Sequence, residues 1–204
     1  MEMDAIKYDV FEDGALVKGV SIKKILPCLA TKGRIRLTMQ LDSELKGNVI
    51  PILASKYAPG KISLIQRKNI LTISDFDRVI TFYPSGKITM NNTRDQEEAI
   101  EIISGIMEKI NEYYLESQSG GQIGEDLSQK LSKIGPLAIY NCLPKTNCEE
   151  CGEATCLAFA MKLLSGESAL EQCIPLTEAK NKGCMDSLRD LIGEQLMKTL
   201  GWNG

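Results

Sequence analysis

Apolar and polar residues alternate most regularly along residues 33–41. The apolar positions are Ile35, Leu37, Met39 and Leu41, and polar residues occupy the places between them. Because successive side chains of a strand point to opposite faces of a sheet, this alternation predicts a half-buried strand. Residues 1–32 have no equally clear pattern, and we expect only a leading strand or arm there.

The next part of the chain predicts one short helix and a series of strands. Glu44 to Tyr57 has apolar residues at helical spacing and Pro51 where a first turn tolerates it, which predicts a helix of two or three turns. Strand-like runs follow at residues 61–66, 69–74, 78–83 and 87–90. Polar turns separate these runs, so they predict an antiparallel meander.

A long helix is predicted after the meander. Thr93 with Gln96 three residues later is a capping-box pattern, which marks the start of a helix. An apolar face then recurs at helical spacing and comprises Ile100, Ile103, Met107, Ile110 and Tyr114. The polar, glycine-rich residues that follow predict a linker, so we place the first domain at residues 1–118 and the linker at 119–126.

Residues 127–204 predict a small, mainly helical second domain. An apolar helical run extends from Leu157 to Leu164. A later amphipathic pattern comprises Met185, Leu188, Ile192, Leu196 and Leu200. With strands gathered in the first domain and helices in the second, the predicted fold class is α+β.

Composition excludes several classes of function. The 204 residues include 24 basic and 27 acidic side chains, and the net charge of −3 gives no general attraction to nucleic acid or to an anionic membrane. Histidine is absent, which excludes Cys-His zinc sites and imidazole bases. The sequence has neither a membrane-spanning apolar stretch nor a signal-peptide pattern, so we expect a cytoplasmic protein that does not bind membranes.

Cysteine is the residue type that indicates chemistry. Four of the seven cysteines have the spacing Cys148-x2-Cys151-x4-Cys156-x16-Cys173. A cubane takes one thiolate for each of its irons, so the pattern predicts that these four residues hold one 4Fe-4S cluster. The alternative is an all-cysteine zinc site, although zinc ribbons usually pair two Cys-x2-Cys knuckles and this chain has one.

Three cysteines lie outside this motif. For Cys28, Cys142 and Cys184 we expect packing or surface positions, because free cysteine behaves as a small hydrophobe. Cys184 is the one most worth testing as a further ligand, since it follows Cys173 by 11 residues. No nucleophile or phosphate-binding loop is visible, so we predict no catalysis by this chain alone.

The residues that flank the four cysteines add a second line of argument. Leu143–Cys148, Glu150–Gly152, Thr155–Cys156 and Ala158–Lys162 resemble the iron-sulfur domain of the corrinoid iron-sulfur protein large subunit. Related modules occur in the B subunit of the Rnf electron-transport complex, and the resemblance spans residues 136–176. It implies a low-potential 4Fe-4S cluster that passes single electrons. It also implies a redox partner, such as a corrinoid protein or a methyltransferase.

The first domain resembles a different family. The order strand, helix, four strands, helix in residues 33–118, with Phe82–Met90 and Glu97–Ile100 near its end, resembles one repeat of the TATA-binding-protein fold. This resemblance implies an antiparallel sheet with helices, and it allows a homodimer through the first domain. A fold does not determine a function, so we do not expect nucleic acid as a partner on this ground.

Together these patterns predict an iron-sulfur protein that carries single electrons in anaerobic corrinoid or one-carbon metabolism. Two alternatives stay open. The chain could be a redox-sensing regulator in which the state of the cluster alters DNA binding, or it could be a cluster carrier or scaffold for a larger enzyme.

Overall fold

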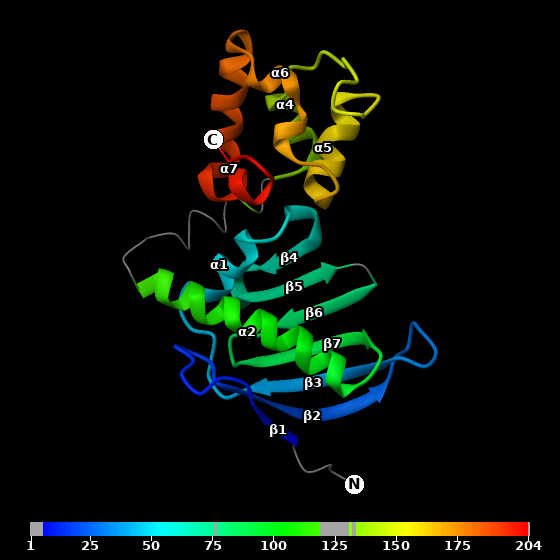
Figure 1. Ribbon diagram of the computed structural model, residues 1–204, viewed down its shortest axis with the longest axis vertical. Coiled ribbons are helices and arrows are strands. Elements are labelled where there is room, and N and C mark those ends of the chain that lie inside the picture. The colour runs from blue at the N-terminus through cyan, green and yellow to red at the C-terminus, as the bar shows by residue number, and fades with distance from the viewer. Residues whose placement is uncertain (1–5, 76, 119–130, 132–133, 204) are drawn as a thin grey trace. The chain divides into compact units, whose positions relative to one another are not determined.

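The computed structural model describes residues 6–75, 77–118, 131 and 134–203 (Figure 1). Contacts divide the chain into two compact units. The sheet unit comprises Met1–Ala54 and Ser63–Gly124, and the cysteine unit comprises Ser55–Ile62 and Glu125–Gly204. The predicted linker at 119–126 and residues 127–130 lie outside the described residues, so the boundaries predicted from the sequence stay predictions.

The sheet unit is built on one seven-stranded sheet with the strand order β1-β2-β3-β7-β6-β5-β4. The strands are β1 (Ile6–Asp9), β2 (Gly19–Pro27), β3 (Ile35–Leu41), β4 (Ile62–Ile65), β5 (Ile70–Asp75), β6 (Arg78–Phe82) and β7 (Lys87–Thr93). Every pair whose register is described is antiparallel. The predicted meander is therefore confirmed, and the α+β class is correct.

Residues 1–32 contribute more to the sheet than the sequence predicted. Their described part forms two strands, β1 and β2, and Val20 and Ile22 of β2 are buried. The first of these pairs with the second, and β2 pairs along its length with β3. The sequence pattern missed this because β2 carries a register shift between Ile22 and Lys24, which interrupts its alternation.

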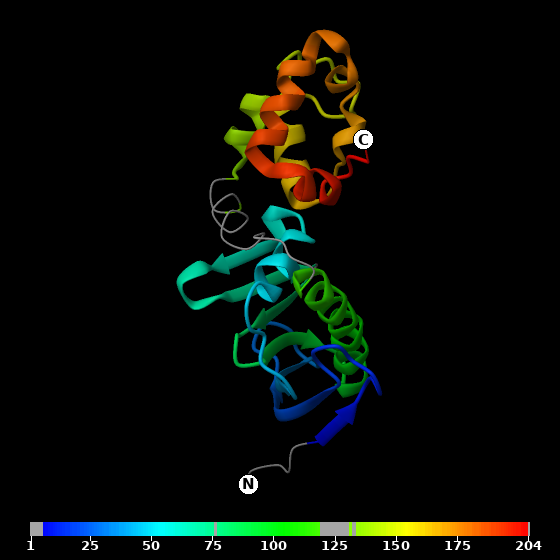
Figure 2. The same ribbon diagram turned by 90° about the vertical axis from the view of Figure 1, so that its left-hand side faces the viewer.

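One face of the sheet packs against helix α2 (Gln96–Gln118), which lies across it in both views (Figures 1 and 2). The predicted apolar face of this helix is confirmed for Ile103, Met107 and Ile110, which are fully buried. At the end of the helix Tyr113 is buried, whereas the predicted Tyr114 is only half-buried. The core of this unit therefore lies between the sheet and α2.

Helix α1 (Val49–Ser55) is shorter than the helix predicted for residues 44–57. Before it, Leu45 is fully buried and its backbone N–H donates to the Pro84 carbonyl at 2.8 Å. This tertiary contact holds the residues before α1 in an irregular path. Local helical spacing could not predict that contact.

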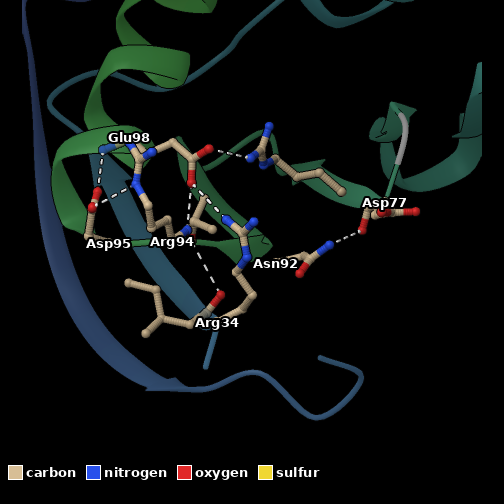
Figure 3. A network of polar contacts seen from close by, with 9 residues as sticks. Arg34, Asp77, Asn92, Arg94, Asp95 and Glu98 are labelled. Atoms are coloured by element: carbon tan, nitrogen blue, oxygen red, sulfur yellow. Dashed lines mark hydrogen bonds and ion pairs between the residues drawn. The ribbon is translucent and has the colours of Figure 1, made fainter. Parts of the chain in front are cut away.

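The N-terminus of α2 is anchored by two carboxylates (Figure 3). Asp95 Oδ1 accepts the Glu98 N–H at 2.8 Å, and Glu98 Oε2 accepts the Arg94 N–H at 2.5 Å. The predicted capping box of Thr93 and Gln96 was wrong. Thr93 is the last residue of β7, and its hydroxyl donates to the Ile35 carbonyl instead.

Glu98 also joins the helix to the sheet. Arg78 Nη2 of β6 lies 3.0 Å from Glu98 Oε1, and Arg34 Nη1 lies 3.6 Å from Oε2. Nearby, Asn92 Nδ2 donates to the Asp77 carbonyl at 3.0 Å (Figure 3). The pKa of Glu98 is held below its usual range, first by the hydrogen bond from the Arg94 N–H and then by the arginine charges.

The cysteine unit is mainly helical. Its elements are η1 (Pro59–Lys61), α4 (Pro136–Cys142), α5 (Cys156–Ser165), η3 (Leu170–Gln172), α6 (Ile174–Thr177), η4 (Ala179–Asn181) and α7 (Lys182–Thr199). The five residues predicted as the apolar face of the last helix are all buried. Helix α7 is kinked at Gly193, whose φ of 76° is not helical.

Residues 55–62 come from the first half of the chain but pack within the cysteine unit. Thr199 Oγ1 donates to the Ser55 carbonyl at 2.8 Å, and Ala58 packs against the core of this unit. At Gly60 a Cβ atom would lie 2.7 Å from the Leu164 carbonyl oxygen, so the two backbones approach too closely for a side chain. The remaining described 3₁₀ turn, η2 (Gln66–Lys68), belongs to the sheet unit.

Within the described part of the chain, no helix has the length and apolar character needed to cross a membrane.

We expect Glu98→Gln to lower the free energy of unfolding by about 1 kcal/mol at neutral pH, because it removes the charge that Arg78 and Arg34 contact. Since the pKa of Glu98 is lowered, its contribution is present above the pKa of the unfolded carboxylate and is lost as pH falls through the folded pKa. Denaturant unfolding followed by circular dichroism at several pH values measures this difference.

Glu97→Gln is the matched control, because Glu97 is exposed on the same helical turn. Equal destabilisation by the two variants, or a Glu98→Gln defect that persists at acid pH, would contradict the assigned role of Glu98.

Candidate metal centre

Four cysteines line one narrow cavity in the cysteine unit: Cys148, Cys151, Cys156 and Cys173. The first two come from the loop between α4 and α5, and the third is the first residue of α5. Cys173 lies between η3 and α6. Phe159 and Pro175 close the apolar side of the cavity.

The loop that carries Cys148 and Cys151 has an unusual backbone. Lys145, Asn147 and Glu149 all have positive φ, at 57°, 46° and 63°. Non-glycine residues adopt this region at a cost, so the loop must be compensated by its contacts.

Gly152 completes the loop directly after Cys151. Its φ is 84°, and its N–H donates to the Glu149 carbonyl at 2.9 Å. No atom lies within 4 Å of the place where a Cβ would stand, so the backbone conformation is what requires glycine here.

Two side chains fix the start of α5 and therefore the position of Cys156. Asn147 Oδ1 accepts the Cys156 N–H at 2.8 Å, and the N-cap residue Thr155 accepts the Ala158 N–H through Oγ1 at 3.1 Å. Cys156 thus lies at the N-terminus of a helix, where the helix dipole favours negative charge. The sequence carried a signal for this cap, since threonine stands directly before an apolar helical run.

The four thiols differ in exposure. Cys173 and Cys156 are buried at 5% and 9% exposure, Cys151 is half-buried and Cys148 is exposed. The pKa of Cys173 is raised to about 11, mainly by burial and to a smaller extent by the charges of the other three cysteines. A thiolate at Cys173 therefore needs a cation beside it, and metal binding there would release a proton.

An ion pair ties the loop to α5. Lys162 Nζ lies 2.7 Å from Glu153 Oε1, and this hydrogen bond raises the pKa of Lys162. The Glu153 side chain lines the cavity and is only 15% exposed. Its charge is thus neutralised locally, whereas Glu149 and Glu150 are exposed beside Cys148.

The other three cysteines do not belong to the cavity lining. Cys142 and Cys184 pack against the core of the cysteine unit, and burial raises the pKa of Cys142. Cys28 directly follows β2 in the sheet unit, where the N–H groups of Thr31 and Ala30 lower its pKa. Their positions agree with the packing and surface roles that the sequence predicted.

The donor set suits a thiophilic metal centre. Four thiols that line one cavity, beside a helix N-terminus, suit the donor set and the negative charge of an iron-sulfur cluster. Among the described residues, no group of three His, Cys, Asp or Glu side chains is arranged to hold a single metal ion.

Comparison with known proteins points to the same segment. Residues 143–175 match a family model described as "Putative Fe-S cluster". The chain is 50% identical over 60 residues to the acetyl-CoA decarbonylase/synthase complex subunit gamma of Methanocaldococcus jannaschii, which is 29% of this chain and 12% of that protein. It is 56% identical over 43 residues to the corrinoid/iron-sulfur protein large subunit of Moorella thermoacetica, which is 21% of this chain and 10% of that protein.

The similarity to these relatives is local. A gamma 2 subunit of the same complex from Methanosarcina thermophila is 56% identical over 45 residues, which is 22% of this chain and 10% of that protein. The chain therefore spans about a tenth of the length of the relatives it matches. No solved structure matches the chain.

These findings support an iron-sulfur cofactor and the predicted resemblance of the cysteine segment. They give no support to the TATA-binding-protein resemblance of the sheet unit, which stays a prediction. The described sheet also has two strands, β1 and β2, before the segment on which that resemblance was based.

We expect Thr155→Ala to lower the free energy of unfolding of the cysteine unit by about 1 kcal/mol, because the first turn of α5 loses its cap. Thr155→Ser keeps the hydroxyl and should retain most of that stability. Trp202, the one tryptophan of the chain, lies in this unit and reports its unfolding by fluorescence. Equal losses in the alanine and serine variants would contradict the capping role.

Proposed function

We propose that this chain binds one 4Fe-4S cluster through Cys148, Cys151, Cys156 and Cys173 and passes single electrons to and from a partner protein. The observation that carries the proposal is that these four thiols line one cavity. The match of residues 143–175 to an iron-sulfur family supports it. When bound, such a cluster supplies reversible one-electron oxidation and reduction.

The exposures of the four ligands support electron transfer at one edge. Cys173 and Cys156 lie on the buried side, where Phe159 and Pro175 exclude water. Cys148 is exposed and therefore marks the side at which a partner can approach. Electron transfer needs close approach of the two centres, so an exposed ligand gives the shortest route for the electron.

The protein groups around the cavity favour the charged form of the site. The helix N-terminus at Cys156 stabilises negative charge. Hydrogen bonds to the sulfurs tune the reduction potential of such centres. The Lys162 ammonium reduces the repulsion that Glu153 would otherwise add.

The relatives suggest where these electrons are used. Proteins named as subunits of the acetyl-CoA decarbonylase/synthase complex and as a corrinoid/iron-sulfur protein share this segment. We propose that the chain donates electrons in anaerobic corrinoid or one-carbon metabolism in the cytoplasm. Its partner would be a redox protein, with a corrinoid protein or a methyltransferase as the first to test.

The test is anaerobic purification of wild type, Cys156→Ala and Cys184→Ala, followed by iron and sulfide assay and by EPR after reduction. We expect about four irons and four sulfides per chain in wild type and a reduced-cluster EPR signal. Cys156→Ala should lose both, because it removes a buried ligand. Cys184→Ala should keep both, because Cys184 does not line the cavity.

Zinc in place of iron in the purified wild type would contradict the proposal and make the site structural. Transfer of the whole cluster to an apo acceptor, without electron transfer, would favour a cluster carrier instead.

A further inference from the structure

A row of threonines crosses the face of the sheet opposite to the buried one. Thr38 of β3 pairs with Thr89 of β7, Thr89 pairs with Thr81 of β6, and Thr81 pairs with Thr72 of β5. The hydroxyls of Thr72 and Thr81 lie 3.1 Å apart. Alternate residues of the same strands, such as Met39, Ile80 and Ile88, are buried on the other side. The row therefore places hydroxyls on the face turned away from α2.

Three residues of this row, Thr38, Thr81 and Thr89, line an open cavity of about 400 Å³. Its lining comprises Lys24, Leu26, Arg36, Leu37, Thr38, Val79, Thr81, Thr89, Met90 and Asn91. Two of these side chains are cationic and none is acidic. The volume is within the range of small-molecule sites, and the lining alternates polar groups with apolar ones.

Arg36 contributes a hydrogen-bond donor without an acceptor to this cavity. Its Nε is shielded from solvent and has no hydrogen-bond partner among the described residues. A buried donor without a partner costs free energy, so the site favours a ligand that accepts from the guanidinium. An anion suits this position best, because guanidinium forms its strongest pairs with carboxylate or phosphate.

A β-bulge explains the position of Arg36. Ile35 pairs with Thr93, but Leu37 pairs with Met90, so two residues of β7, Asn91 and Asn92, lie opposite Arg36. Asn92 takes a φ of 58° at this point. Bulges change the direction of side chains and are frequent at functional sites.

Lys24 and Asn91 line the same cavity as Arg36, and Lys24 adds a second positive charge. On β2, Lys24 pairs with Thr38 of β3 and Leu26 pairs with Arg36 of β3. Lys24 is therefore two residues along β2 from the residue that pairs with Arg36. Asn91 Oδ1 accepts the Val79 N–H at 2.6 Å, which leaves the Asn91 Nδ2 as a further donor. One end of the cavity thus offers two positive charges and an amide donor.

From this arrangement we infer that the sheet unit binds a small phosphate monoester that carries hydroxyl groups, such as a sugar phosphate. The phosphate lies between Arg36 and Lys24, and the hydroxylated body lies along the threonine row. A phosphate monoester has a charge of about −1.5 to −2 near neutral pH, which matches the two cations. The threonine hydroxyls can both donate to and accept from the hydroxyls of such a body.

The experiment is isothermal titration of the full chain, kept anaerobic, with ribose 5-phosphate, inorganic phosphate and ribose. We expect saturable binding of ribose 5-phosphate, weaker binding of inorganic phosphate and none of ribose. Arg36→Gln and Lys24→Gln should each weaken ribose 5-phosphate binding by roughly tenfold or more, since each removes a charged hydrogen bond. Lys24 is exposed, so its loss cannot disrupt folding of the sheet.

Two further variants separate the parts of the proposal. Lys23→Gln is the matched control, because Lys23 is exposed on the same strand and does not line the cavity; its binding should equal that of wild type. Thr89→Val removes one hydroxyl from the centre of the row, and it should weaken ribose 5-phosphate binding while leaving inorganic phosphate unchanged.

The inference is overturned if neither phosphate compound binds to wild type, or if Arg36→Gln and Lys24→Gln bind like Lys23→Gln. It is also overturned if a DNA duplex binds with steep salt dependence while ribose 5-phosphate does not, since the face would then recognise a polymer backbone. Iron loading is measured on the same samples, so failure of this site is distinguishable from failure of the cluster site.

Discussion

The cysteine unit depends on the burial of thiols beside one another. Cys173 and Cys156 are almost fully buried, and each thiolate raises the cost of forming the next. A free thiol at Cys173 favours its protonated form, whereas a bound metal centre would stabilise it as a thiolate. The left-handed residues of the loop add to the cost of this arrangement. Binding of a metal centre would therefore be coupled to the folding of residues 143–175.

The sheet unit has a different constraint, because one face of its sheet is buried and the other is open. On the buried side, α2 is held by Asp95 and Glu98, and two arginines, Arg78 of β6 and Arg34 just before β3, converge on Glu98. This arrangement fixes the helix against strands that are distant in sequence. The open side needs no packing, so its residues are free to serve binding, and there the hydroxyls and cations are gathered. Antiparallel sheets commonly divide their two faces in this way.

Much of the secondary structure could be predicted because it follows from local periodicity. The strands from Ile35 onward and the last helix, with Met185 and Leu196 on its buried face, have regular patterns that tertiary contacts do not override. The errors lie where tertiary contacts decide. The bulge in β2 interrupts the alternation by which that strand could have been predicted. The contact of Leu45 with Pro84 makes α1 shorter than predicted. Thr93 belongs to the buried end of β7, and Asp95 caps α2 in its place. A capping pattern in the sequence does not specify which of two nearby polar residues caps the helix and which stays in the preceding strand.

The two sites differ in how far the sequence could predict them. The four cysteines were predictable because three of them lie within nine residues and their spacing is itself the chemical signal. Asn147, which accepts the Cys156 N–H, has a left-handed φ, and no sequence pattern predicts that backbone conformation. Strand register alone brings together four threonines, Thr38, Thr72, Thr81 and Thr89. The position of Arg36, whose Nε has no hydrogen-bond partner among the described residues, depends on a β-bulge. The residues proposed for each site nevertheless all belong to one unit, so each site depends on the folding of that unit alone.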